Sequence, residues 1–213
     1  MTCSTDRPSL PAGWVVVADR QSIVDQIQRP LRPEIQLGGV EIRLDLWRDG
    51  PPILVPQEGL SVLVTDRGGL QQTERTATRN QLCQKLGAIL DVDPTTDEPP
   101  PAGQPWIYSC HRTDENQISA QQQVSEARQM GAIGAKIVMP RASEEYRQIA
   151  LELPRFDPQF PVVCFCAGLQ GTDDRMLALE LGQPWGYAKL DQYPEGIAGL
   201  PTLDQIYQRL QRH

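Results

Sequence analysis

Eight short runs rich in aliphatic and aromatic residues recur along the 213-residue chain, and segments with helical spacing separate most of them. The runs span residues 13–18, 39–46, 60–67, 88–93, 106–111, 131–140, 160–167 and 185–190. Apolar runs that alternate with helices are typical of parallel strands buried on both faces. Eight such strands favour a closed (β/α)8 barrel, the TIM-barrel fold, as a single domain over residues 1–213.

Apolar residues at helical spacing predict helices over residues 22–28, 75–86, 119–130, 144–153 and 203–210, and one more that ends at residue 181. Residues 47–59 and 94–105 are rich in proline, which removes a backbone donor and restricts the preceding residue, so we expect loops there. The barrel should therefore be compact, with some connecting helices shortened or missing. A doubly wound sheet is the alternative, but Ala18-Asp19-Arg20 follows the first strand where that fold would have a glycine-rich turn.

The charge of the chain argues against one class of partner. The formal net charge is -7 at pH 7, whereas proteins that bind nucleic acid usually carry a basic face. No apolar run approaches the length of a membrane span, and residues 1–11 lack the apolar core of a signal peptide. We therefore expect a cytoplasmic protein that binds neither nucleic acid nor a membrane.

The five cysteines do not form a metal-binding pattern. Cys3, Cys83, Cys110, Cys164 and Cys166 contain no C-x-x-C pair, and the only neighbouring histidine is His111 beside Cys110. This pattern is more typical of reduced, mostly buried thiols than of metal ligands. We expect no metal and no other cofactor.

Lys136 is the single charge inside the apolar run at residues 131–140. The chain has only three lysines, Lys85, Lys136 and Lys189, so general basicity does not explain its presence there. A lysine is rarely buried without a partner or a task, and removal of an ammonium from water favours the neutral, nucleophilic amine. Two interpretations stay open: a lysine that forms a Schiff base, or a strand-end lysine whose stem carries the charge to solvent.

The run at residues 39–46 alternates, with Glu41, Arg43 and Asp45 on one face and aliphatic residues on the other. Such a strand either lies at an edge with a solvated face or lies inside a barrel where its charges pair.

Two further polar residues stand at the ends of predicted strands. Arg67 ends the third run, and His111, the only histidine besides His213, ends the fifth. A surface arginine and a structural histidine are the common outcomes for such residues. In barrel enzymes, however, the carboxyl ends of the strands are where active sites are assembled.

Five short motifs occur in one order along the chain: Glu41-Ile42-Arg43-Leu44-Asp45, Thr65-Asp66-Arg67, Ser109-Cys110-His111, Gly131-Ala132 followed by Lys136-Ile137, and Gly168, Gly171 and Arg175. Together they resemble the E-x-R-x-D, T-x-R, S-x-H, G-A-D-I-x-K-I and G-x-x-G-x-x-S-R motifs of type I 3-dehydroquinate dehydratases, the Schiff-base lyases of the shikimate pathway. The resemblance lies in spacing more than in identity, and it identifies the chain as similar to a divergent member of that family.

The resemblance implies a role for six residues. Lys136 would form the imine with the ketone of 3-dehydroquinate, and His111 would move the protons of the elimination that gives 3-dehydroshikimate. Arg175 would bind the substrate carboxylate, while Glu41, Arg43 and Arg67 would bind its hydroxyls. The residue types suit this chemistry, because an iminium is an electron sink and an imidazole titrates near neutral pH. The family also implies a small-molecule substrate and the pairing of two copies as a homodimer.

The chain departs from the family in two places. Gln71 stands where a glutamate orients the family's histidine, so Asp91, Asp93 or Glu74 would have to replace it. Residues 195–200 lack the serine and glutamine of the family's S-A-P-G-Q loop. These differences leave two alternatives: a Schiff-base enzyme for a related keto acid, or a barrel that binds a hydroxy-acid through Arg67 and Arg175 without catalysis.

Overall fold

The computed structural model describes residues 9–28, 33–47, 49, 52–55, 57–67, 73–111, 120–141, 143–168, 171–193 and 197–212. The strands are β1 (Gly13–Ala18), β2 (Leu37–Arg43), β3 (Ser61–Thr65), β4 (Ile89–Val92), β5 (Trp106–His111), β6 (Gly134–Arg141), β7 (Val162–Ala167) and β8 (Trp185–Ala188). The helices are α1 (Gln21–Ile27), α2 (Thr73–Leu86), α3 (Ala120–Gln129), α4 (Glu144–Glu152), α5 (Thr172–Glu180) and α6 (Leu203–Leu210), with a 3-10 turn at Leu153–Arg155.

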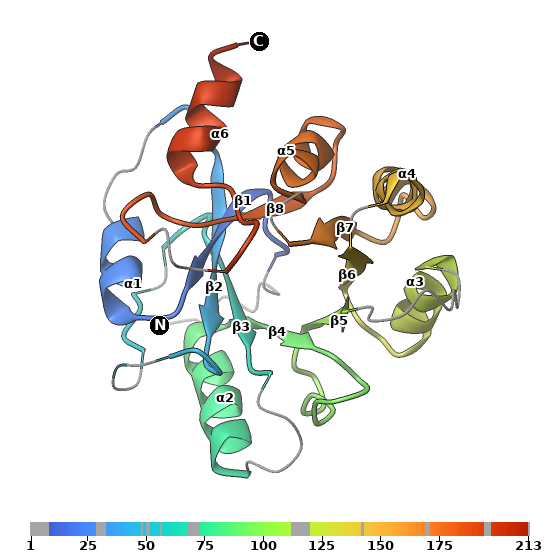
Figure 1. Ribbon diagram of the computed structural model, residues 1–213. Coiled ribbons are helices and arrows are strands. Elements are labelled where there is room, and N and C mark those ends of the chain that lie inside the picture. Colours follow the sequence, from blue (N-terminus) through green and yellow to red (C-terminus); the bar gives the residue numbers. More distant parts are fainter. Residues whose placement is uncertain are drawn as a thin grey trace.

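The eight strands form one parallel sheet that curls into a barrel, with the helices outside it (Figure 1). Each of β1 to β6 is bonded to the next strand in sequence, and β8 returns to pair with β1. This order confirms the predicted (β/α)8 barrel. None of the helices in the described part of the chain is long and apolar enough to cross a membrane.

Alternation along the strands divides the core into two layers. One side of each strand packs against the helices, as with Ala135 and Ile137 of β6, and the other side fills the barrel. The barrel interior is filled by apolar side chains from seven strands and one loop: Val15, Val17, Leu63, Ile89, Ile107, Val138, Val163, Phe165, Trp185, Tyr187 and Leu200. The inward faces of the strands also carry polar residues, among them Glu41 of β2, Asp91 of β4 and Lys136 of β6.

Most of the predicted elements are confirmed, including the helix-free connection between β4 and β5 over residues 93–105. Six of the eight predicted strands were too long at one end or both, and two of these differences concern the motifs. β2 ends at Arg43 because the backbone turns at Leu44, so Asp45 lies outside the strand. β6 begins only at Gly134, since Gly131 (φ 81°) belongs to the turn that ends α3. Ser143 caps α4, as its side chain accepts a hydrogen bond from the Tyr146 amide.

The ring of backbone hydrogen bonds has one seam, between β7 and β8. Gln183, just before β8, bridges it with a buried side chain. Its Oε1 accepts from the Cys164 amide of β7 at 3.0 Å, and its Nε2 donates to the Cys164 carbonyl at 2.9 Å and to the Ala150 carbonyl of α4 at 3.1 Å. A side-chain amide therefore supplies the bonds that a neighbouring strand would have made.

Replacement of Gln183 with alanine is expected to lower the free energy of unfolding by about 2–4 kcal/mol. The substitution removes the hydrogen bonds that Gln183 makes with buried backbone groups of Cys164 and Ala150, and the loss of a partner at a buried polar group costs about 1–3 kcal/mol. Denaturant titration would measure the loss, with Gln148→Ala on the exposed face of α4 as the matched control. A loss no larger than that of the control would contradict this account of the seam.

Candidate active site

Lys136 lies inside the barrel, with only 5% of its surface exposed. As the third residue of β6 it is on the inward side, and its Nζ donates to the Glu41 Oε1 of β2 at 3.3 Å and to the Asp91 Oδ2 of β4. Contacts that reach β2 and β4 place the amine within the barrel interior. The interpretation as a strand-end lysine that reaches solvent is therefore wrong.

Asp91 is completely buried and joins two cations. One carboxylate oxygen accepts from Lys136 and the other from Arg67, which follows β3. Burial alone would raise the pKa of Asp91, but the charges of Arg67 and Lys136 outweigh it and hold this pKa well below its ordinary value. Asp91 is thus a fixed anion at neutral pH.

Arg67 is the most heavily bonded side chain of the group. Besides Asp91 it donates to Asp97 Oδ2 at 3.0 Å and to Ser109 Oγ at 2.6 Å. Desolvation would lower the pKa of Arg67, but the carboxylates of Asp91, Asp97 and Glu41 raise it above its ordinary value. The guanidinium therefore keeps its charge and a fixed orientation.

Glu41 and Arg43 both point toward the barrel interior from β2, which confirms the interpretation of this strand as an interior one with paired charges. Glu41 is buried and accepts from Thr65 Oγ1 at 2.6 Å as well as from Lys136. Arg43 donates to both carboxylate oxygens of Asp45, at 2.9 and 2.7 Å. Desolvation would lower the pKa of Arg43, but the Asp45 and Glu41 carboxylates raise it.

His111 is the last residue of β5 and keeps an exposed side chain at the carboxyl end of the barrel. Partial desolvation, followed by the charges of Lys136 and Arg67, lowers the pKa of His111 to about 4. The surrounding water weakens this shift, but its direction keeps the imidazole neutral at neutral pH and therefore able to accept a proton.

The predicted partner of His111 is not found. Among the described residues, no side chain makes a hydrogen bond with His111: Asp91 is paired with Lys136 and Arg67, and Asp93 accepts from Thr95. Gln71 and the side chain of Glu74 lie outside the described residues, as do residues 195 and 196 of the segment compared with the family's S-A-P-G-Q loop.

Two aromatic rings link Lys136 to Arg175. The Lys136 Nζ lies 5.1 Å from the centre of the Tyr187 ring, which meets the Phe165 ring edge-on at 5.8 Å. The Arg175 guanidinium covers the Phe165 ring at 4.8 Å. An apolar surface thus separates the amine from the guanidinium.

Arg175 is a buried cation without an acidic partner among the described residues. It comes from the first half of α5 and is 5% exposed; its Nη1 donates to the Gly199 carbonyl, and its Nε has no hydrogen-bond partner. Burial lowers the pKa of Arg175 to about 10. Because a buried charge is costly unless it is paired, an anionic ligand would find both charge and donors here.

Hydrogen bonds to the Gly199 carbonyl hold the loop that follows β8 against Arg175 and the start of α5. This carbonyl accepts from Thr172 Oγ1 at 3.2 Å as well as from Arg175. The same loop sends Leu200 into the apolar layer of the barrel and packs Ile197 against it. In this arrangement the loop presents apolar side chains to the barrel interior.

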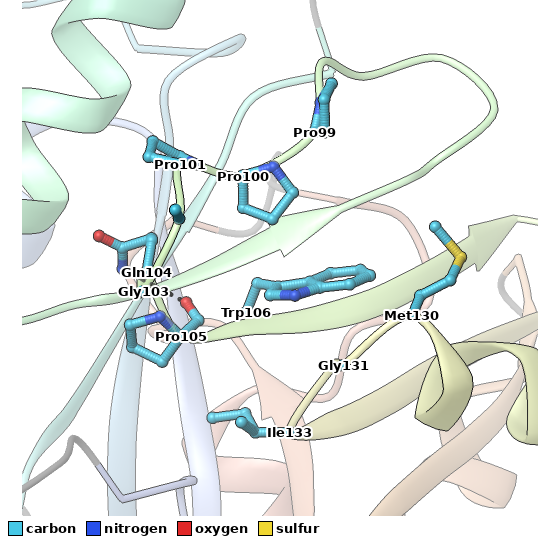
Figure 2. A pocket seen from close by; sticks show the side chains of 11 residues that line it. Pro99, Pro100, Pro101, Gly103, Gln104, Pro105, Trp106, Met130, Gly131 and Ile133 are labelled. Carbon is cyan, nitrogen blue, oxygen red and sulfur yellow. Dashed lines mark hydrogen bonds between the residues drawn. The ribbon is translucent and has the colours of Figure 1, made fainter.

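A cavity at the opposite end of the barrel does not compete with this site. A cavity of about 570 Å³ lies at the amino ends of β5 and β6, where Figure 2 shows the Trp106 indole between Pro100 and Met130. Its lining has no titratable side chain, which leaves it without groups for catalysis. In the described part of the chain there is no group of three potential metal ligands, and Cys83, Cys110, Cys164 and Cys166 form no disulfide with one another.

The structure brings all six predicted site residues to the interior or the carboxyl end of the barrel, and it adds residues that the sequence did not single out. Phe165 could have been found, because alternation through residues 160–167 places it on the inward side with Val163. Asp97 gave no comparable signal, since it lies in the proline-rich connection. Only the folding of that loop brings its carboxylate to the Arg67 guanidinium.

No family model and no curated protein sequence matches this chain. Its fold is similar to that of 3-dehydroquinate dehydratase from Geobacillus kaustophilus HTA426, with 16% identity, a TM-score of 0.67, and coverage of 96% of this chain and 91% of that one. Type I 3-dehydroquinate dehydratase from Clostridium difficile, solved with covalently modified comenic acid, has 12% identity, a TM-score of 0.64, and coverage of 96% and 93%. The Aquifex aeolicus VF5 dehydratase has 17% identity, a TM-score of 0.62, and coverage of 93% and 97%. At these identities the likeness establishes the fold.

Proposed function

We propose that this protein is a cytoplasmic lyase of the shikimate pathway, and so of aromatic amino acid biosynthesis, that removes water from 3-dehydroquinate to give 3-dehydroshikimate through an imine on Lys136. The observation that carries the proposal is the buried Lys136 amine inside the barrel, with His111 at the carboxyl end of the adjacent β5 and Arg67 just after β3. Dehydratases with this activity in their names share the fold.

The imine supplies the driving force for the elimination. The Lys136 ammonium would pass a proton to the ketone oxygen and attack the ketone carbon as the amine. The oxygen would then leave as water, so that a C=N bond replaces the C=O bond. The iminium withdraws electrons from the adjacent carbon, and neutral His111 takes its proton. The resulting electron pair expels the hydroxyl, which leaves as water after His111 returns the proton. A water molecule then hydrolyses the product imine, which releases dehydroshikimate and restores the Lys136 ammonium.

Arg175 would hold the substrate by its carboxylate. The guanidinium is buried, has no acidic partner among the described residues, and retains an unbonded Nε. Phe165 and Tyr187 would contact the carbon ring between the carboxylate and the imine. Glu41, Arg43 and Arg67 would face the hydroxyls, although Arg67 already has three acceptors in the structure.

A related keto acid is the second candidate substrate. Ile197 and Leu200 give the loop after β8 an apolar surface, which suits a less hydroxylated ring or chain better than dehydroquinate. The imine chemistry on Lys136 would be the same.

The test is to incubate the protein with dehydroquinate and sodium borohydride, which reduces an imine to a stable amine, and to map the adduct by peptide mass. Formation of dehydroshikimate is followed in parallel without borohydride. An adduct on Lys136 with turnover is the expected result, and an adduct without turnover would favour the related keto acid. A folded protein with neither adduct nor turnover would overturn the proposed function.

A further inference from the structure

The reacting nitrogen of the proposed function already has a buried carboxylate in contact with it. Asp91 accepts from Lys136 with one oxygen and from Arg67 with the other, and it has no exposed surface. No step of the proposed reaction uses this group. A fully buried anion at the reacting atom calls for a role of its own.

The charge at the Lys136 nitrogen is the same before and after imine formation. The ammonium and the ketone give an iminium and one water molecule, so two N–H protons leave with the ketone oxygen and one positive charge stays on the nitrogen. A carboxylate that neutralises the ammonium therefore neutralises the iminium as well. The surrounding residues need not rearrange their charges.

We propose that Asp91 is a further catalytic residue of this site, the counter-ion that holds the Lys136 nitrogen as a cation and keeps its imine with the ketone protonated. This inference rests on the proposed function. Only the protonated imine is an effective electron sink, whereas burial by itself favours the uncharged form. The fixed anion offsets that effect.

The neighbours of Asp91 favour it over Glu41 for this role. Glu41 lies 3.3 Å from the Lys136 Nζ and shares the same oxygen with Thr65, whereas Asp91 has an oxygen for Lys136 alone. Titratable groups that interact with this carboxylate come from four other strands or their ends: Lys136 of β6, Arg67 after β3, His111 of β5 and Arg43 of β2. The Tyr187 ring of β8 covers the amine from the remaining side.

The first test measures the free protein. Acetylation with N-acetoxysuccinimide at pH 7.5, followed by peptide mass analysis, gives the rate at Lys136 relative to the exposed Lys85 in the same molecule. Asp91→Asn is expected to raise this ratio about tenfold or more, because loss of a close opposite charge changes a pKa by about 1–3 units. Asp97→Asn is the matched control, since it removes a second carboxylate from Arg67 without touching Lys136.

The second test measures the imine. Sodium cyanoborohydride reduces a protonated imine in preference to a neutral one, so the adduct yield with dehydroquinate falls at the pH where the iminium loses its proton. In Asp91→Asn, the pH at which the adduct yield falls is expected to be lower by about 1–3 units. Asp91→Glu is expected to bring this pH part of the way back to the wild-type value. A role in stability alone would leave the pH of the fall unchanged.

The outcomes separate the two proposals. No adduct in the folded wild-type protein overturns the proposed function, and the inference about Asp91 is then decided by the acetylation ratio. An adduct in the wild type with the same acetylation ratio and the same pH of the fall in Asp91→Asn overturns the inference alone. Asp91→Ala is made as a second variant in case Asp91→Asn does not fold. The result is taken from whichever of the two shows a native circular dichroism spectrum.

Discussion

Replacement of Lys136 with alanine is expected to abolish the borohydride adduct and to reduce turnover of dehydroquinate by about 10⁴-fold or more, because no other described side chain places an amine inside the barrel. Peptide mass analysis measures the adduct, and the appearance of dehydroshikimate measures turnover. Lys85→Ala on α2 is the matched control, since this lysine is exposed and far along the chain from the site.

Stability has to be separated from chemistry in this experiment. Removal of the Lys136 ammonium leaves Asp91 and Glu41 without their shared cation, and an unpaired buried charge costs about 3–5 kcal/mol. Lys136→Arg keeps a cation in place but cannot form an imine. Substantial turnover by either variant, with the protein folded, would contradict the role of Lys136.

The second large effect is expected at His111. His111→Ala should reduce turnover by about 10²–10⁴-fold while the borohydride adduct on Lys136 still forms, because general acid–base catalysis serves the elimination and not the covalent attachment of the substrate. Rapid-quench mass analysis would then find the imine as the accumulated species. His111 has no hydrogen-bond partner among the described residues, so its removal should leave stability almost unchanged.

An adduct that is lost together with turnover in His111→Ala would show that the histidine acts before the imine forms. Turnover within tenfold of the wild type would show that a different group moves the protons. Asp93 would then be examined first, because it lies on the same side of the barrel two residues after Asp91.

The sequence predicted the positions of the site residues better than their partners. Lys136, His111 and Arg67 could be placed because alternation along a strand fixes the side of the sheet, and because parallel strands end together at one edge of a barrel. The same alternation put Glu41 and Arg43 on one face of β2, but it did not decide between a solvated face and an interior one. Local pattern is sufficient to choose the face of a strand.

Partners depend on the register between strands that are distant in sequence. Lys136 meets Glu41 across 95 residues and Asp91 across 45, so no local pattern distinguishes Asp91 from Asp93 as the partner. The same limit applies to Gln183 at the seam and to Asp97 in the proline-rich connection. The prediction that a carboxylate orients His111 finds no support in the described residues. Asp91, one of the three predicted candidates, is bound to Lys136 and Arg67 instead.

The pairing of β8 with β1, and not with β7, determines when the barrel can close on the ribosome. β1 begins at residue 13 and its last partner begins at residue 185. At synthesis rates of about 5–20 residues per second, the nascent chain must hold β1 with a free edge for roughly ten seconds or more. An unpaired apolar edge invites pairing with other chains, so chaperone occupancy during translation should fall only after β8 has left the exit tunnel.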